Sequence, residues 1–90
     1  MVDLRSVKQL KLSALEKLGI TQLGEELPKD LTRSKIDDAI FFLNQASEDY
    51  LYLAMSGIDS AQDKETAYNQ YDRCNDLLRR LREYRAPGKI

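Results

Sequence analysis

The residues that usually carry catalysis are scarce in this chain of 90 residues. It contains no histidine, which removes the usual general base near neutral pH and the usual partner of a nucleophilic serine or cysteine. A single cysteine, Cys74, cannot form a structural zinc site without other ligands. The thiol falls on the apolar face of a predicted helix, beside Tyr71 and Leu78, where burial and low reactivity are expected. The sequence predicts a protein that is not an enzyme and has no cofactor, no metal and no small-molecule substrate.

The carboxylates do not form a recognisable ligand set either. Two adjacent pairs, Asp37/Asp38 and Glu48/Asp49, lie in one predicted helix, where neighbouring side chains point about 100° apart. Residues 59–71 fail as a calcium loop, because the required glycine is replaced by Lys64. No glycine-rich phosphate loop occurs in the sequence. We interpret the acids as a solvated helix face.

Three segments repeat apolar residues at steps of three and four, the period of an α-helix. The first predicted helix covers about 2–18 and ends at Gly19. The second covers about 34–57, with Ser34 and Asp37 as a capping box and Thr32 as the alternative cap. The third covers about 60–85, begins at Ser60, and ends before Pro87 and Gly88. The predicted fold is an all-α, three-helix domain dominated by a long antiparallel α-hairpin of the second and third helices.

The predicted core follows these periods. It comprises Leu4, Val7, Leu10, Ala14 and Leu18 of the first helix; Ile36, Ala39, Leu43, Ala46, Tyr50, Leu53 and Gly57 of the second; and Ala67, Tyr71, Cys74, Leu78 and Leu81 of the third. Residues 20–33 form a connector that contains Gly24 and Pro28. Its apolar residues are expected to dock onto the core: Ile20, Leu23, Leu27 and Leu31. The single domain, 1–90, thus divides into a first helix at 1–19, the connector at 20–33, the hairpin at 34–86 and a tail at 87–90.

Charge is segregated along the chain, although the net charge is −1. Residues 1–35 carry seven basic and five acidic residues, residues 36–70 one basic and seven acidic, and residues 71–90 six basic and three acidic. Folding the hairpin symmetrically about residues 58–59 would bring Arg79 and Arg80 close to Asp38 and Asp37. Helical spacing also favours pairs of Asp76 with Arg80 and of Arg79 with Glu83. We therefore expect much of this charge to be neutralised within the molecule.

One stripe of the second helix mixes large apolar residues with polar ones. The candidate partner-binding residues are Phe41, Glu48, Asp49, Tyr52 and Met55. Aromatic residues and methionine are enriched at interfaces, where acidic neighbours would form a polar rim and steer a basic partner. Three occupants of the stripe remain open: the connector or tail of the same chain, a second copy, or a different protein.

The alternative function is nucleic-acid binding. Residues 13–20 (SALEKLGI) and 34–40 (SKIDDAI) resemble the helix–loop–helix of SAP-type nucleic-acid-binding modules over about 28 residues. The loop is longer than in that family, and the second helix runs past the usual length, so the resemblance assigns no family. The candidate phosphate contacts are Lys8, Lys11, Lys17, Lys29, Arg33, Lys35, Arg79, Arg80 and Arg82.

The most favoured function is protein–protein interaction or assembly. The N-terminal residues lack the apolar stretch of a signal peptide, and no run of about 18–20 apolar residues could span a bilayer. We therefore expect a cytoplasmic protein without membrane contacts. Small helical chains without catalytic groups are typical of phage-encoded accessory proteins and of inhibitors of host enzymes, which makes such a viral role a hypothesis.

Overall fold

Side-chain caps set the start of each helix in the computed structural model, which describes residues 3–57 and 60–84. Helix α1 (Leu4–Leu18) follows Asp3, whose carboxylate accepts a hydrogen bond of 2.8 Å from the backbone N–H of Ser6. Helix α2 (Arg33–Tyr52) follows Thr32, and helix α3 (Ala61–Glu83) follows Ser60. Each cap occupies one backbone N–H that a helix leaves without an intrahelical partner.

The capping box predicted at Ser34 is wrong, and the alternative cap, Thr32, is correct. The hydroxyl of Thr32 accepts the backbone N–H of Lys35 at 3.2 Å. This register places Leu31 just before the cap and Ile36 four residues after it, and both are buried in the core. Apolar residues at these two positions fix the entry of the chain into a helix. The first helix begins at Leu4, after its cap Asp3. The start predicted at about residue 2 and the end predicted at about residue 85 lie outside the described residues.

The second helical run ends at Gly57, as predicted, but its last turn is not α-helical. The α-helix stops at Tyr52, and the chain continues as a π-helical segment, η1 (Leu53–Gly57). Leu53 remains buried in this segment, whereas Met55 is exposed. Apolar spacing does not distinguish an α-turn from the slightly wider π-turn, so the sequence pattern missed the change. The burial predicted for Gly57 and the turn predicted at residues 58–59 lie outside what the structure describes.

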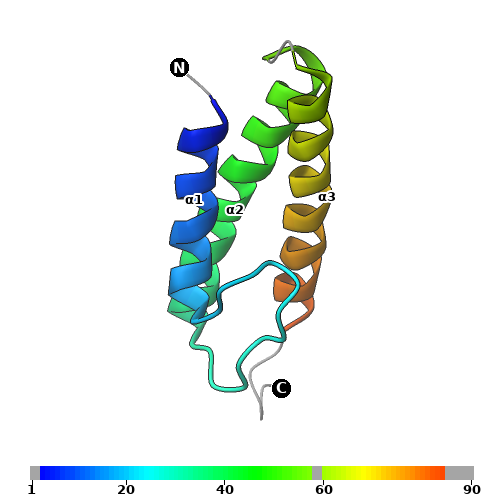
Figure 1. The fold of residues 1–90 in the computed structure, drawn as a ribbon. Helices are drawn as coiled ribbons and strands as arrows, with labels where there is room; N and C mark the ends of the chain where they lie inside the picture. Colours follow the sequence, from blue (N-terminus) through cyan, green and yellow to red (C-terminus); the bar gives the residue numbers. More distant parts are fainter. Residues whose placement is uncertain (1–2, 58–59, 85–90) are drawn as a thin grey trace.

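Helix α2 is the centre of the fold (Figure 1). Helices α1 and α3 each pack along α2, whereas few backbone positions of α1 and α3 approach each other. The described residues contain three α-helices and no strand, so the predicted all-α class and the helical hairpin are confirmed. The resulting molecule is a rod of 48 × 19 × 18 Å.

The predicted core is confirmed in most positions. Every described seam residue of α2 is buried, and Leu4, Leu10 and Tyr71 of the other helices are partly buried. The periodic pattern missed Leu15 and Leu77, which are 3% and 0% exposed. The connector docks as expected, since its four apolar residues lie against the core: Ile20, Leu23 and Leu31 buried, and Leu27 partly buried.

The end of α3 holds the connector in place. The guanidinium of Arg80 donates to the backbone carbonyls of Leu23 (3.2 Å) and Glu25 (2.8 Å). The hydroxyl of Tyr84 accepts the N–H of Leu31 at 3.3 Å and donates to the carbonyl of Pro28 at 3.0 Å. Arg80 therefore binds the connector, and its predicted proximity to Asp37 is wrong.

The predicted pairing of Arg79 with Asp38 is also wrong, because the hairpin has another register. The hydroxyl of Ser47 donates to Asn75 at 2.8 Å, whereas symmetric folding would place Asn75 near residue 42. Arg79 instead pairs within α3, with Asp76 at 2.6 Å and with Glu83 at 3.6 Å. The predicted pair of Arg79 with Glu83 is confirmed, and Asp76 binds Arg79 rather than Arg80.

Replacing Gly19 by alanine should destabilise the fold. Gly19 closes α1 with φ of 75°, a conformation that costs other residues about 1 kcal/mol, although an added Cβ would meet no atom. Gly19→Ala should lower the free energy of unfolding in urea by about 1 kcal/mol. Gly24→Ala is the control, because Gly24 does not have a positive φ and a Cβ added there would also meet no atom. This variant should be neutral or slightly more stable than the parent chain. Equal losses in both variants would contradict this account.

Removing the hydroxyl of Tyr84 should loosen the connector. Tyr84→Phe leaves the Leu31 N–H and the Pro28 carbonyl without this partner in a partly buried position, which costs about 1–2 kcal/mol. Urea denaturation should show this loss, and amide hydrogen exchange should increase in residues 20–31. Tyr68→Phe is the control, because it removes a hydroxyl from an exposed side chain. It should change neither measurement.

Candidate docking surface

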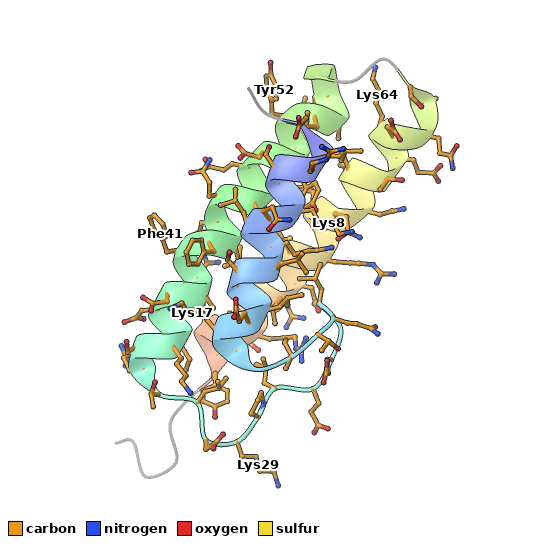
Figure 2. All side chains as sticks on the ribbon, turned by 60° about the vertical axis from the view of Figure 1, so that its left-hand side comes forward. Lys8, Lys17, Lys29, Phe41, Tyr52 and Lys64 are labelled. Atoms are coloured by element: carbon orange, nitrogen blue, oxygen red, sulfur yellow. The ribbon has the colours of Figure 1, made fainter. Side chains whose placement is uncertain are left out.

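The predicted stripe lies on the outer side of α2 and η1, away from the other two helices. Phe41 and Met55 are each 70% exposed, and Tyr52 is 56% exposed. Figure 2 shows Phe41 and Tyr52 projecting from α2 away from the bundle. Phe41 precedes Met55 by fourteen residues, about 20 Å of helix at 1.5 Å per residue. The structure therefore aligns three large apolar side chains along one accessible edge of the rod.

Local helical geometry explains why these side chains are left outside. Phe41 is adjacent to Phe42, which turns towards the core and is partly buried. The two rings meet edge to face, with centroids 5.6 Å apart. This contact supports the position of the exposed ring without covering it.

Acidic side chains border the apolar stripe. Glu48 is exposed, and Asp49, partly buried, accepts a hydrogen bond of 3.1 Å from Gln45. Asp38 at the lower end pairs with Lys17 of α1 at 3.7 Å, and about half of each side chain remains exposed. Glu48 makes no ion pair with any described residue. The rim of the stripe is therefore negative, and Glu48 is the acid most available to a partner.

The connector does not cover the stripe, contrary to one of the predicted possibilities. It crosses the fold on the side where α1 and α3 face each other (Figure 1). The predicted tail, 87–90, lies outside the described residues. The tail, a second copy and a different protein therefore stay predicted occupants of the stripe.

The nine predicted basic residues do not share one surface. Lys17 and Lys35 border a hollow of about 450 Å³ that also contains Asp30, Asp38 and Glu16. Lys29 lies on the connector, and Arg33 is exposed at the start of α2.

The three predicted basic residues of α3 each have another partner. Arg79 is paired inside α3, Arg80 binds the connector, and Arg82 donates to Asn44 at 3.4 Å. Lys8 and Lys11 of α1 lie apart from these and line a groove that α3 also borders.

The structure adds one basic residue that the sequence pattern did not single out. Arg73 of α3 lies across from Lys8 and Lys11, and the three line one groove. Arg73 was missed because α1 and α3 are about 60 residues apart in the chain, and no local spacing reveals which faces of two helices meet. The exposed Tyr68, stacked on Tyr71 with ring centroids 5.9 Å apart, was also outside the predicted set.

The remaining reactive groups are buried or dispersed. Burial raises the pKa of the Cys74 thiol to about 11, which suppresses the nucleophilic thiolate at neutral pH. Within residues 3–57 and 60–84, no three acidic or sulfur side chains converge to hold a metal ion. None of the described helices has the length and apolar character needed to cross a membrane.

The buried thiol predicts a loss of stability in alkaline solution. The unfolded thiol ionises near its usual value of 9.0, whereas the folded thiol ionises near 11, so the unfolded state gains a charge first as the pH rises. The free energy of unfolding should therefore fall between these values, by at most about 1.4 kcal/mol per pH unit. Cys74→Ala should flatten this slope, and an unchanged slope in that variant would contradict the assignment. Tyr50, whose pKa burial raises to about 12, adds a further decrease above its usual value of 10.0.

Comparison of the chain with protein-family models, with curated proteins and with solved structures finds no match.

Proposed function

We propose that this chain is a non-catalytic binding protein that docks the outer face of α2 onto a basic, partly apolar surface of another protein. The observation that carries the proposal is the exposure of Phe41, Tyr52 and Met55 along one edge of the rod. Burying an apolar side chain of this size contributes about 1.5–3 kcal/mol. Two or three of them in one contact would supply the central cluster on which most interfaces depend.

The charges around the stripe favour a basic partner over a symmetric pair of copies. In a two-fold dimer, the same patch of each copy faces the other, so the acidic rims would also face each other. Like charges placed across an interface are unfavourable. A partner with lysine or arginine around an apolar patch would instead gain from Glu48 and Asp49, chiefly in its rate of association.

Nucleic-acid binding through the nine predicted basic residues has weaker support. Lys17 is paired with Asp38, and Arg79 is paired with Asp76 and Glu83. Arg80 is engaged with the connector. A basic stripe suited to a phosphate backbone would require such residues to remain available on one face.

The finer predictions about biological setting stay hypotheses. A cytoplasmic location, a viral origin and a role as an inhibitor of a host enzyme rest on composition and on the scarcity of catalytic groups. The docking proposal does not depend on them.

Charge insertion into the stripe tests the proposal. Phe41→Asp and Tyr52→Asp should each abolish association with the partner, because a carboxylate would be buried in the apolar centre of the contact. Both positions are exposed, so helicity by circular dichroism should remain that of the parent chain. The partner is first captured with a photo-reactive residue placed at Phe41, and binding by purified variants is then measured.

Tyr68→Asp is the matched control, because Tyr68 is an aromatic residue on α3 with 53% exposure. It should bind as the parent chain does. The proposal fails if Phe41→Asp and Tyr52→Asp both retain binding, or if Tyr68→Asp loses binding to the same degree. Light scattering over a wide concentration range shows whether the partner is a second copy, which would replace the proposed basic partner.

A further inference from the structure

A second face of the molecule has the opposite charge. Between α1, the connector and α3 lies an open groove of about 290 Å³, lined by three cations, Lys8, Lys11 and Arg73. Its other polar lining residues are neutral, namely Thr21, Gln22 and Gln70, and no acid lines it. The groove lies away from the outer face of α2 and shares no residue with the stripe.

The three cations are not held in ion pairs, although Asp72 and Asp76 lie beside Arg73 along a second hollow. None of them makes an ion pair with a described residue. The positions three and four residues before and after Lys8 and Lys11, which neighbour them on the helix surface, hold no acid. Lys8 is itself one of these neighbours of Lys11, at a distance of three residues. The acid three residues after Arg73 is Asp76, which already binds Arg79 at 2.6 Å.

The position of Lys11 adds to this imbalance. Its ammonium group is partly buried and donates to the side-chain oxygen of Gln70 at 3.0 Å. Burial lowers the pKa of Lys11, and the positive charges of Lys8 and Arg73 lower it further. Placing three positive charges close together costs free energy, and a bound anion would offset this cost.

We propose that this groove binds a phosphoryl group, supplied either by a small phosphorylated molecule or by a nucleic-acid backbone. A terminal phosphoryl group carries a charge of about −1.5 to −2, which suits three cations better than the single charge of a carboxylate. A nucleic-acid backbone carries one charge per phosphate and would match it with two successive phosphates. Arg73 offers paired donors to two of its oxygens, while Lys8 and Lys11 act as point charges. The open groove of about 290 Å³ has room for a diphosphate.

The apolar lining gives the site its walls. Leu15 and Leu23 are buried beneath the groove, and Leu12 stands at its edge with 40% exposure. Apolar walls reduce the screening of the three charges by water, which strengthens their attraction for an anion. A ligand with an organic group beside its phosphate would be able to rest this group on Leu12.

Titration with inorganic pyrophosphate, followed through the backbone amide signals at low ionic strength, tests the proposal. Shifts should concentrate in residues 8–12, 21–23 and 70–73. Arg73→Gln, at an exposed position, should weaken binding about ten-fold or more, since a hydrogen bond to a charged group is lost. Lys11→Gln should do the same, and its own amide spectrum reports whether the fold is retained.

Lys64→Gln is the control, because it also removes one positive charge from the molecule. Lys64 lies at the start of α3, away from Lys8 (Figure 2). It should leave the affinity unchanged. A short single-stranded oligonucleotide forms the second arm of the test. If it alone shifts the groove signals, and Arg73→Gln removes the effect, the phosphate belongs to nucleic acid.

The proposal is overturned if neither probe shifts the groove signals, or if Lys64→Gln weakens binding as much as Arg73→Gln. The second result would indicate attraction to net charge rather than a site. Phe41→Asp should bind pyrophosphate normally, so this proposal and the docking proposal fail or succeed separately.

Discussion

The fold depends on the burial of one broad apolar face of α2 against both other helices. The backbones of α1 and α3 scarcely approach each other, although the side chains of Lys11 and Gln70 meet at 3.0 Å, so the central helix supplies most of the contact that buries their apolar faces. The gap between the outer helices is closed by the connector, which brings Ile20, Leu23 and Leu31 into the core. Hydrogen bonds from Arg80 and Tyr84 hold that connector, which explains why the end of α3 carries these two residues.

This arrangement leaves two surfaces with different chemistry. A central helix with neighbours on both flanks keeps one outer edge free, and this edge carries Phe41, Tyr52 and Met55 within an acidic rim. The connector fills the gap between α1 and α3, and a cationic groove borders it. Both proposed sites are therefore consequences of the way in which the three helices share one core.

Ion pairs hold a few of the charged side chains that the structure describes. Arg79 is held by two acids of its own helix, and Lys17 by one acid of the adjacent helix. Exposed pairs of this kind contribute at most about 1 kcal/mol each, so they orient side chains more than they stabilise the fold. Among the cations without an ion pair, Lys8, Lys11 and Arg73 share one groove that no acid lines, and Lys11 donates there to the neutral side chain of Gln70.

The sequence by itself determined the helices, most of the core and the exposed stripe. These features depend on the helical period, and positions such as Leu43, Ala46 and Phe41 follow from their angle around one helix. The sequence also contained the residues of the caps, although the choice between Thr32 and Ser34 required knowing that Leu31 is buried.

Tertiary structure alone decided which residues from distant segments meet. The hairpin register, which separates Arg79 from Asp38, depends on the packing of two helices and on the π-helical segment between them. The clamp of Tyr84 on the connector and the placing of Arg73 opposite Lys8 and Lys11 join residues more than fifty positions apart. Periodicity describes the face of each helix, but the rotation and axial shift between helices are set by side-chain packing, which no local pattern records.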